Sequence, residues 1–276
     1  MKNVKKLLAV LLAGLMLLSL AACGGKDENV VKFGVIEGSG MDTAITPEHN
    51  EHMKKHNGDD DATLERINYD NLSSALMDLE SGKIKAVGVE KCTADYIAAH
   101  NDKVTVVVNN RTTDFSMLTS DSNTEVYDIL NNAIKDMKAD GALDALIENE
   151  LKAYIESDPE AKDLPAFEGA KTIKVGVTGD LPPMDFVAAN GKAAGFNIAL
   201  LTEIANRAQV NFEIVQIESG ARAMALSTGK VDAVFWARSS TCTVCGATGA
   251  EKFDGTIVTE SYFSDNTASV MLKSDK

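Results

Sequence analysis

The chain repeats one short pattern in each of its halves, and this repeat constrains the fold more than any other feature. Residues 31–35 (VKFGV) match 173–177 (IKVGV), and residues 79–87 (LESGKIKAV) match 226–234 (LSTGKVDAV). Each unit reads as strand, loop and helix, followed by a helix that ends at Gly-Lys before a further strand. We therefore expect two similar α/β lobes, with a cleft between them of the kind in which small polar ligands bind.

Strands and helices alternate along the rest of the chain. Apolar runs and helical spacing predict strands at 30–36, 84–89, 104–108, 112–119, 172–177, 211–217 and 231–236, and helices at 46–56, 69–81, 93–100, 125–138, 142–155, 197–208 and 221–227. This order favours α/β lobes, each built on a mostly parallel sheet flanked by helices. Residues 157–169 hold two of the five prolines and form the best linker candidate.

The first 23 residues indicate export. Three lysines at positions 2, 5 and 6 precede the uncharged, apolar run 7–22, which is short for a membrane span. The run ends in Leu-Ala-Ala-Cys-Gly, which resembles a lipobox and implies cleavage before Cys23 and a lipid on that cysteine. We then expect residues 23–29 to be a tether and the folded part to lie lipid-anchored at the outer face of the cytoplasmic membrane. The alternative is an ordinary signal peptide, or a membrane helix, with a chance cysteine.

Charge and cysteine usage exclude some classes of function. The formal net charge of −14 argues against partners such as nucleic acids and anionic lipid surfaces, which need a basic face. Besides Cys23, only Cys92, Cys242 and Cys245 remain, which is too few for a disulfide framework. The hydrophobic core must therefore supply most of the stability.

Several short motifs stand out along the chain: 174–177 (KVGV), 182–186 (PPMDF), 190–198 (NGKAAGFNI), 227–233 (STGKVDA), 261–263 (SYF), 34–40 (GVIEGSG) and 138–141 (KADG). They resemble the family 3 solute-binding proteins of ABC importers, the two-lobed type II proteins that bind polar amino acids. The resemblance implies a periplasmic-binding-protein-like fold, a small polar solute, an ABC permease as partner, and neither catalysis nor a cofactor.

These motifs occur in the wrong order for that family, which implies a circular permutation. Residues 30–111 resemble the family's second lobe, residues 112–156 return to the first lobe, 157–170 join the original termini, and 171–276 resemble the first lobe. Termini that lie close together permit such a rearrangement. The alternative is a fusion of halves from two proteins.

The resemblance also places candidate ligand residues in both lobes. Ser39 and Gly40 precede a predicted helix start, where free N–H groups favour an anion, although Ser39 could equally be a helix cap. Glu90 occupies the place of the acid that binds an α-ammonium group, with Lys91 as its alternate. Asp180 lies in the opening loop and could also meet an ammonium group. The other interpretation of Glu90 and Asp180 is that both are surface acids.

Four further candidates belong to the second half. Phe186, or Met184 in its place, occupies the loop in which an aromatic ring packs on the ligand. Trp236, Arg238 and Ser239 end a strand that presents groups to the ligand, although Trp236 is as readily a core residue. Amino-acid binders of the family carry an arginine three residues after the threonine that corresponds to Thr241, where this chain has Val244. Arg238 could replace it in gripping a carboxylate; otherwise the ligand lacks an α-carboxylate.

Two clusters remain outside this interpretation. Cys242 and Cys245 form a C-x-x-C for which a local disulfide is favoured over free thiols, a redox site or a metal site. Histidines at positions 49, 52 and 56 share one face of a predicted helix and could bind a metal, although a solvated polar face is favoured. We predict no metal site.

Other classes of function stay open. An enzyme on the same fold, such as a dehydratase, would need acid and base groups in the cleft, for which Glu90 and Asp180 are the candidates. A redox protein would act through the C-x-x-C, and a sensor lipoprotein would signal through a partner. Turnover of a bound solute would separate an enzyme from a binding protein.

Overall fold

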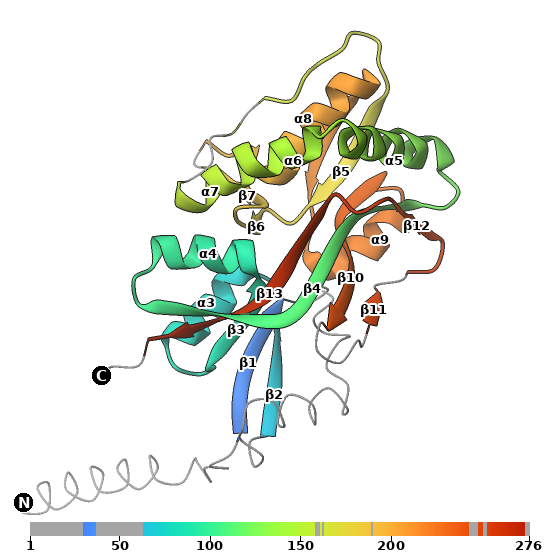
Figure 1. The fold of residues 1–276 in the computed structure, drawn as a ribbon. Helices are drawn as coiled ribbons and strands as arrows, with labels where there is room; N and C mark the ends of the chain where they lie inside the picture. Colours follow the sequence, from blue (N-terminus) through green and yellow to red (C-terminus); the bar gives the residue numbers. More distant parts are fainter. Residues whose placement is uncertain are drawn as a thin grey trace, which may run out of the picture.

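The computed structural model describes residues 30–36, 63–157, 161, 163–188, 190–242, 248–250 and 253–273. Figure 1 shows an N-terminal lobe and a C-terminal lobe joined by two long strands, β4 and β13. The predicted fold class, an α/β protein of two lobes, is therefore confirmed. Within the described ranges no helix is both long and apolar enough to cross a membrane.

The N-terminal lobe contains three parallel strands and two helices. These are β1 (Val30–Ile36), β2 (Thr63–Tyr69), α3 (Leu72–Glu80), β3 (Ala86–Glu90) and α4 (Lys91–His100). Helix α3 begins at its cap Asn71, whose side chain accepts from the backbone N–H of Ser74, and buries Leu72, Ala75 and Leu79. The cap leaves the N–H groups of the first helical residues for other partners.

The C-terminal lobe repeats this arrangement. Its main elements are β5 (Thr172–Val177), α8 (Phe196–Ala208), β9 (Asn211–Gln216), the 3₁₀ turn η2 (Ser219–Ala221), α9 (Arg222–Ser227) and β10 (Ala233–Cys242). Strands β9, β5 and β10 are parallel over their paired residues. A small second sheet, of β6 (Asp180–Leu181), β7 (Asp185–Val187) and β8 (Ala193–Ala194), lies between β5 and α8 in the chain.

A layer of helices from the middle of the chain belongs with this lobe. It consists of α5 (Thr124–Ala139), α6 (Ala142–Leu146), the π-helical segment η1 (Ile147–Leu151) and α7 (Lys152–Glu156). Helix α5 and η1 pack on α8, whereas α7 packs on α4 of the N-terminal lobe. Figure 1 shows these helices along the upper side of the molecule. The last helix of the layer thus bridges the two lobes.

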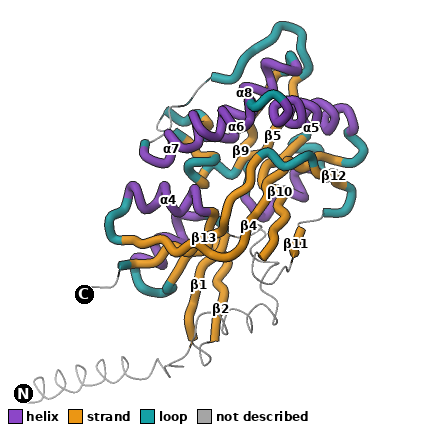
Figure 2. Tube along the Cα trace, in the orientation of Figure 1, coloured by secondary structure: helices purple, strands orange, loops and turns teal. Residues whose placement is uncertain are grey.

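Strands β4 (Val104–Ser120) and β13 (Phe263–Leu272) cross between the lobes in opposite directions (Figure 2). They stand at the centre of one sheet of order β2-β1-β3-β13-β4-β10-β5-β9, to which β11 (Thr248–Ala250) and β12 (Thr256–Val258) add short edges. Strand β13 pairs with β3 of the N-terminal lobe, and β4 pairs with β10 of the C-terminal lobe. Both lobes are therefore joined by continuous backbone pairing.

The crossing strands alter the expected boundaries. Residues 104–108 and 112–119, expected as two strands, form the single strand β4, which runs through the boundary predicted at 111–112. Residues 267–270, assigned to the C-terminal lobe, pair with β3. The physical reason is that each crossing strand supplies the other's hydrogen-bond partners, so neither strand ends between the lobes.

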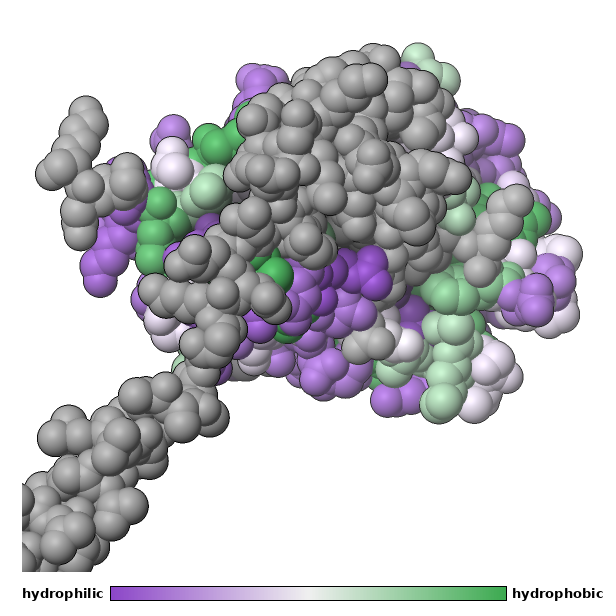
Figure 3. All heavy atoms as spheres, turned by 90° about the horizontal axis from the view of Figure 1, so that it is seen from below, coloured by the Kyte–Doolittle hydropathy of each residue, from purple (hydrophilic) through white to green (hydrophobic). Residues whose placement is uncertain are grey.

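The core is continuous through these strands. Fully buried residues of both lobes, among them Leu79, Phe115, Ile173 and Ala268, belong to one hydrophobic cluster. Figure 3, which views the molecule from below, shows hydrophilic residues mixed with smaller hydrophobic areas over the described part of that face. The buried hydrophobic cluster therefore extends from one lobe to the other along the strands that join them.

Candidate functional site

Three of the described candidate residues, Glu90, Asp180 and Arg238, make contacts where the two lobes meet, and two of them form a buried ion pair. Glu90 ends β3 in the N-terminal lobe, and Arg238 lies on β10 in the C-terminal lobe. The Oε1 atom of Glu90 is 3.0 Å from the Nη1 atom of Arg238, and the two side chains are 3% and 4% exposed. The sequence analysis proposed this acid and this arginine as contacts for opposite ends of one ligand. In the structure, the two side chains contact each other across the lobes.

Local structure explains why Glu90 is free to reach across. Glu90 is the N-cap residue of α4, but its side chain makes no capping hydrogen bond. Asp265 of β13 does this instead, because its Oδ2 atom accepts from the backbone N–H of Cys92 at 2.7 Å. Burial raises the pKa of Asp265. The crossing strand therefore caps α4 and leaves the carboxylate of Glu90 to Arg238.

Two aromatic rings hold the guanidinium of Arg238. Its Cζ atom lies 5.3 Å from the ring centre of Phe115 on β4 and 5.1 Å from that of Trp236. The two rings meet edge to face, 5.2 Å apart. Cation–π contacts strengthen when the cation is desolvated. Arg238 is therefore a fixed cation with little freedom to follow a ligand.

The ion pair leaves one nitrogen of the Arg238 guanidinium without a hydrogen bond. Among the described residues, the buried Nε atom of Arg238 has no partner, and the Oε1 atom of Glu90 and the Nη1 atom of Arg238 have none besides each other. Buried polar atoms are nearly always paired in folded proteins. The Nε–H group of Arg238 is thus available to a small polar molecule that enters between the lobes, and the paired oxygen of Glu90 and Nη1 group of Arg238 become available only if that molecule separates them.

Trp236 is a core residue rather than an open platform. It is 2% exposed and has the left-handed φ of 72°, at a bulge where β10 carries an extra residue against β4. Its indole N–H donates to the Oδ2 atom of Asp185 at 2.7 Å, and its carbonyl accepts from the Nη1 atom of buried Arg222 at 2.6 Å. These two contacts hold the bulge, and the bulge positions the ring beside Arg238.

Sequence reasoning missed Asp185 and Arg222 as organisers of the site. The carboxylate of buried Asp185 also accepts from the Thr178 hydroxyl, the Gly179 N–H and the Asn197 amide. The sequence signal for Asp185 was a single charged residue inside the apolar run 181–187, and such a residue is equally typical of a loop. Its partners come from three separate segments, which no local pattern connects.

Asp180 makes a second contact between the lobes. It lies on β6 of the C-terminal lobe, and its Oδ2 atom accepts from the backbone N–H of Leu72, at the start of α3 in the N-terminal lobe, at 2.8 Å. A second backbone N–H, that of Ser73, also favours its charged form. Burial outweighs both contacts and raises the pKa of Asp180 to about 6.

Two candidates are not brought to the ion pair by any contact in the structure. Ser239 follows Arg238 on the same strand, so its exposed side chain points to the opposite face of the sheet. Phe186 pairs through its backbone with Asp180 in the small sheet and is only half-buried. Met184, its alternate, is completely buried.

Other predictions fall outside the described residues. These are the lipid attachment at Cys23, the anion site at Ser39 and Gly40, the histidine cluster, and the disulfide between Cys242 and Cys245, since nothing of Cys245 or of the Cys242 side chain is described. Cys92 is buried and free. Within the described ranges no group of His, Cys, Asp or Glu side chains has the arrangement of a metal site.

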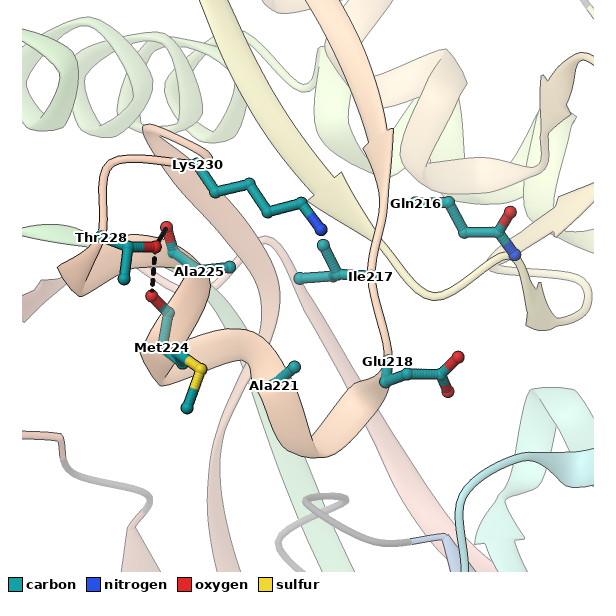
Figure 4. A pocket seen from close by; sticks show the side chains of 8 residues that line it. All are labelled: Gln216, Ile217, Glu218, Ala221, Met224, Ala225, Thr228 and Lys230. Carbon is teal, nitrogen blue, oxygen red and sulfur yellow. Dashed lines mark hydrogen bonds between the residues drawn. The ribbon is translucent and has the colours of Figure 1, made fainter.

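A surface pocket of about 500 Å³ lies elsewhere on the C-terminal lobe (Figure 4). Its lining residues are Gln216, Ile217, Glu218, Ala221, Met224, Ala225, Thr228 and Lys230. The Lys230 side chain extends across it toward Ile217, while Gln216 and Glu218 point away on the far side. None of the candidate ligand residues lines this pocket, and Met224 and Lys230 are exposed. The meeting of the lobes is therefore the stronger candidate.

Three solved structures from bacterial import systems resemble the chain at low sequence identity. The zinc-bound ligand-binding component of an ABC-type import system from Staphylococcus aureus has 10% identity and a TM-score of 0.47, covering 88% of this chain and 66% of its own. The periplasmic aliphatic sulphonate binding protein SsuA from Escherichia coli has 11% identity and a TM-score of 0.40, covering 89% and 62%. A putative L-cystine ABC transporter from Listeria monocytogenes has 11% identity and a TM-score of 0.38, covering 90% and 84%. The chain thus spans less than two thirds of the first two proteins, and none of these similarities assigns a solute.

The family comparison is more specific. No curated protein shows significant sequence similarity to the chain. Residues 173–244, which run from β5 through β10, match the model of bacterial extracellular solute-binding proteins, family 3. This segment contains Asp180, Phe186, Trp236 and Arg238. The resemblance is thereby confirmed for this family 3 segment of the chain.

Proposed function

We propose that this protein captures an amino acid, or a related small polar solute, between its two lobes and delivers it to an ABC permease. One observation carries the proposal: Glu90 and Arg238, opposite charges from different lobes, are buried within 3.0 Å of each other. When the lobes separate, a carboxylate and a guanidinium face each other, and an amino acid carries the complementary ammonium and carboxylate. The family 3 segment supports the solute-binding part.

The same proposal includes the cellular context. A lipid on Cys23 would tether the protein at the outer face of the cytoplasmic membrane, where a permease is accessible. The family description supports an extracytoplasmic location, and the lipobox-like residues 20–24 support the anchor. Growth with radiolabelled palmitate tests this part: incorporation that disappears in Cys23→Ser supports the anchor, and unlabelled wild-type protein would contradict it.

We also propose that the chain is a circular permutant of the family. Its family 3 segment lies in the second half of the chain, and residues 157–170 lead from the helices on the C-terminal lobe into β5 of the same lobe. Both ends of the described chain, β1 and β13, belong to or reach the N-terminal lobe. A variant that starts at residue 171, continues to 276, and passes through a short linker to 24–156 should fold and bind the same solute.

A binding screen tests the function directly. The chain from Gly24 onward is heated with single amino acids, their amine and amide analogues, and short peptides, because a solute that binds only the folded state raises the melting temperature by mass action. Calorimetry then compares wild type with Glu90→Gln, Arg238→Met and, as a control, Glu213→Gln on the exposed side of β9. Loss of binding in the first two variants alone supports the site.

Each other outcome has a definite meaning. Binding of amines but not of amino acids would show that Arg238 does not receive a carboxylate and would change the solute class. Binding that survives both charge substitutions would place the solute elsewhere. NMR of the bound solute during the same experiment would reveal consumption, and turnover would favour an enzyme with Glu90 and Asp180 as its acid and base groups.

A further inference from the structure

Charged side chains of the protein itself make direct contacts across the lobes at two separate places. At one, the carboxylate of Asp180 lies against the first N–H group of α3. At the other, Glu90 lies against Arg238. Each contact joins a group of the C-terminal lobe to a group of the N-terminal lobe, and each uses an arrangement by which proteins bind small charged solutes.

The contact of Asp180 is that of an anion at a helix start. The first N–H groups of a helix have no partner within the helix and attract negative charge. In α3 the cap Asn71 accepts only from Ser74, so the N–H groups of Leu72 and Ser73 remain for an anion from outside. Asp180 provides this anion from the other lobe. It therefore occupies the position that a carboxylate or another anionic group of a solute would take.

The ion pair between Glu90 and Arg238 likewise occupies groups that a solute would use. Glu90 cancels the charge of Arg238, and Phe115 and Trp236 hold the guanidinium in place. A solute that uses either charge must separate the pair, since both side chains are almost completely buried. The Nε atom of Arg238, which is buried and has no hydrogen-bond partner, is a further donor that such a solute could use.

We infer that Asp180 with Leu72, and Glu90 with Arg238, form an interlobe latch that holds the solute-free lobes together and that a solute must displace. This inference deepens the proposed function, because the latch occupies the proposed binding site. The protein's own carboxylates act as internal competitors, so the affinity for a solute is reduced by the population of the latched state. Cutting the latch without touching the solute should open the lobes.

The pH should change the population of the latched state through protonation of Asp180. The groups that face its carboxylate are the N–H groups of Leu72 and Ser73, with the carboxylates of Asp185 and Glu218 acting from a distance. Burial in the latched state raises the pKa of Asp180 to about 6, whereas a solvated aspartate in separated lobes titrates at its ordinary value near 3.8. Closure therefore takes up a proton between these values. The latched population should rise as the pH falls from 7 to 5.

Scattering of the solute-free protein tests the latch without any knowledge of the solute. We expect Asp180→Ala to increase the radius of gyration at pH 7, and wild type to become more compact between pH 7 and pH 5. Asp180→Asn keeps an acceptor for Leu72 but cannot titrate, so it should stay compact and lose the pH response. Asp232→Ala is the matched control, because Asp232 accepts the N–H of Lys174 at 2.8 Å within one lobe.

Hydrogen exchange at the start of α3 gives the second measurement. Exchange of the Leu72 and Ser73 amides should become at least about tenfold faster in Asp180→Ala and remain unchanged in Asp232→Ala. Equal scattering and equal exchange in wild type and Asp180→Ala would overturn the latch. Failure of the solute screen would leave these results unaffected, so the latch and the proposed function are tested separately.

Discussion

The two lobes share one βαβ plan and differ mainly where the chain leaves it. Strands β1 and β5 are the central parallel strands of their lobes, and Gly34 and Gly176 occupy matching positions on them. Helices α3 and α9 both end at a glycine with positive φ, Gly82 and Gly229. Even the exposed side chains correspond, since Met77 and Met224 are 70% and 69% exposed.

The two lobes differ at the exit of the repeated unit, that is, in the segment where the chain leaves it. In the N-terminal lobe β3 stops at Glu90 and α4 begins at the next residue. In the C-terminal lobe the chain bulges at Trp236 and continues as β10 to Cys242. One exit therefore ends in an acid and the other carries an arginine, and the crossing strands bring the two together. The shared plan thus gives the two lobes the same scaffold, and the unequal exits supply the two charges of the candidate site.

The largest loss of stability should come from breaking the ion pair between Glu90 and Arg238, which lie at the two exits. Arg238→Met or Glu90→Gln leaves one buried charge unpaired, and we expect each to lower the free energy of unfolding by about 3–5 kcal/mol. The double variant should recover much of this loss, because it buries no unpaired charge. Urea denaturation of the four proteins measures the coupling. Additive losses would show that the exits are independent.

The second test compares the central strands. A Cβ atom at Gly176 would lie 2.6 Å from the Ile217 Cδ1 atom, and one at Gly34 would lie 2.9 Å from the Ile84 Cδ1 and Tyr69 Cε2 atoms. We expect Gly176→Ala and Gly34→Ala each to cost about 1–3 kcal/mol of stability, with the larger loss at Gly176. Melting curves check this expectation. A loss at only one position would show that the lobes are packed differently at this point.

The smallest losses of stability should come from the glycines that follow α3 and α9, and the two losses should be equal. Gly82 and Gly229 have φ of 76° and 68°, and a Cβ atom at either position would meet no atom within 4 Å. Gly82→Ala and Gly229→Ala should therefore each cost about 1 kcal/mol, the penalty of the left-handed conformation alone. Guanidinium denaturation of both variants tests this equality. A difference beyond the error would mean that one helix end moves in the native protein.

Sequence reasoning recovered the elements that have their own periodicity. The helices expected at 125–138 and 197–208 are α5 and α8, and the strands at 30–36 and 172–177 are β1 and β5. It missed β2, because residues 63–69 mix charged and apolar types and read neither as a strand nor as a helix. It also divided β4, because the polar residues around Arg111 resemble a loop until β13 and β10 pair with them.

The role of the candidate site residues in binding stays a prediction. The resemblance pointed to Glu90, Asp180 and Arg238 as separate contacts for a solute, and the structure places all three in contacts between the lobes. It could not show that Glu90 and Arg238 touch each other, or that Asp180 meets α3. These contacts depend on how two lobes are oriented, and their residues are far apart in the chain.

The sequence by itself determined the repeated α/β units, because hydrophobic periodicity and the Gly-Lys turns act over a few residues. It also determined that one exit carries an acid, Glu90, and the other an arginine, Arg238. Only the tertiary structure decided which charges are paired, since a buried pair requires elements from both lobes to exclude water together. Likewise, the bulge at Trp236 exists because Asp185 and Arg222, from separate segments, hold a backbone conformation that no short stretch would adopt alone.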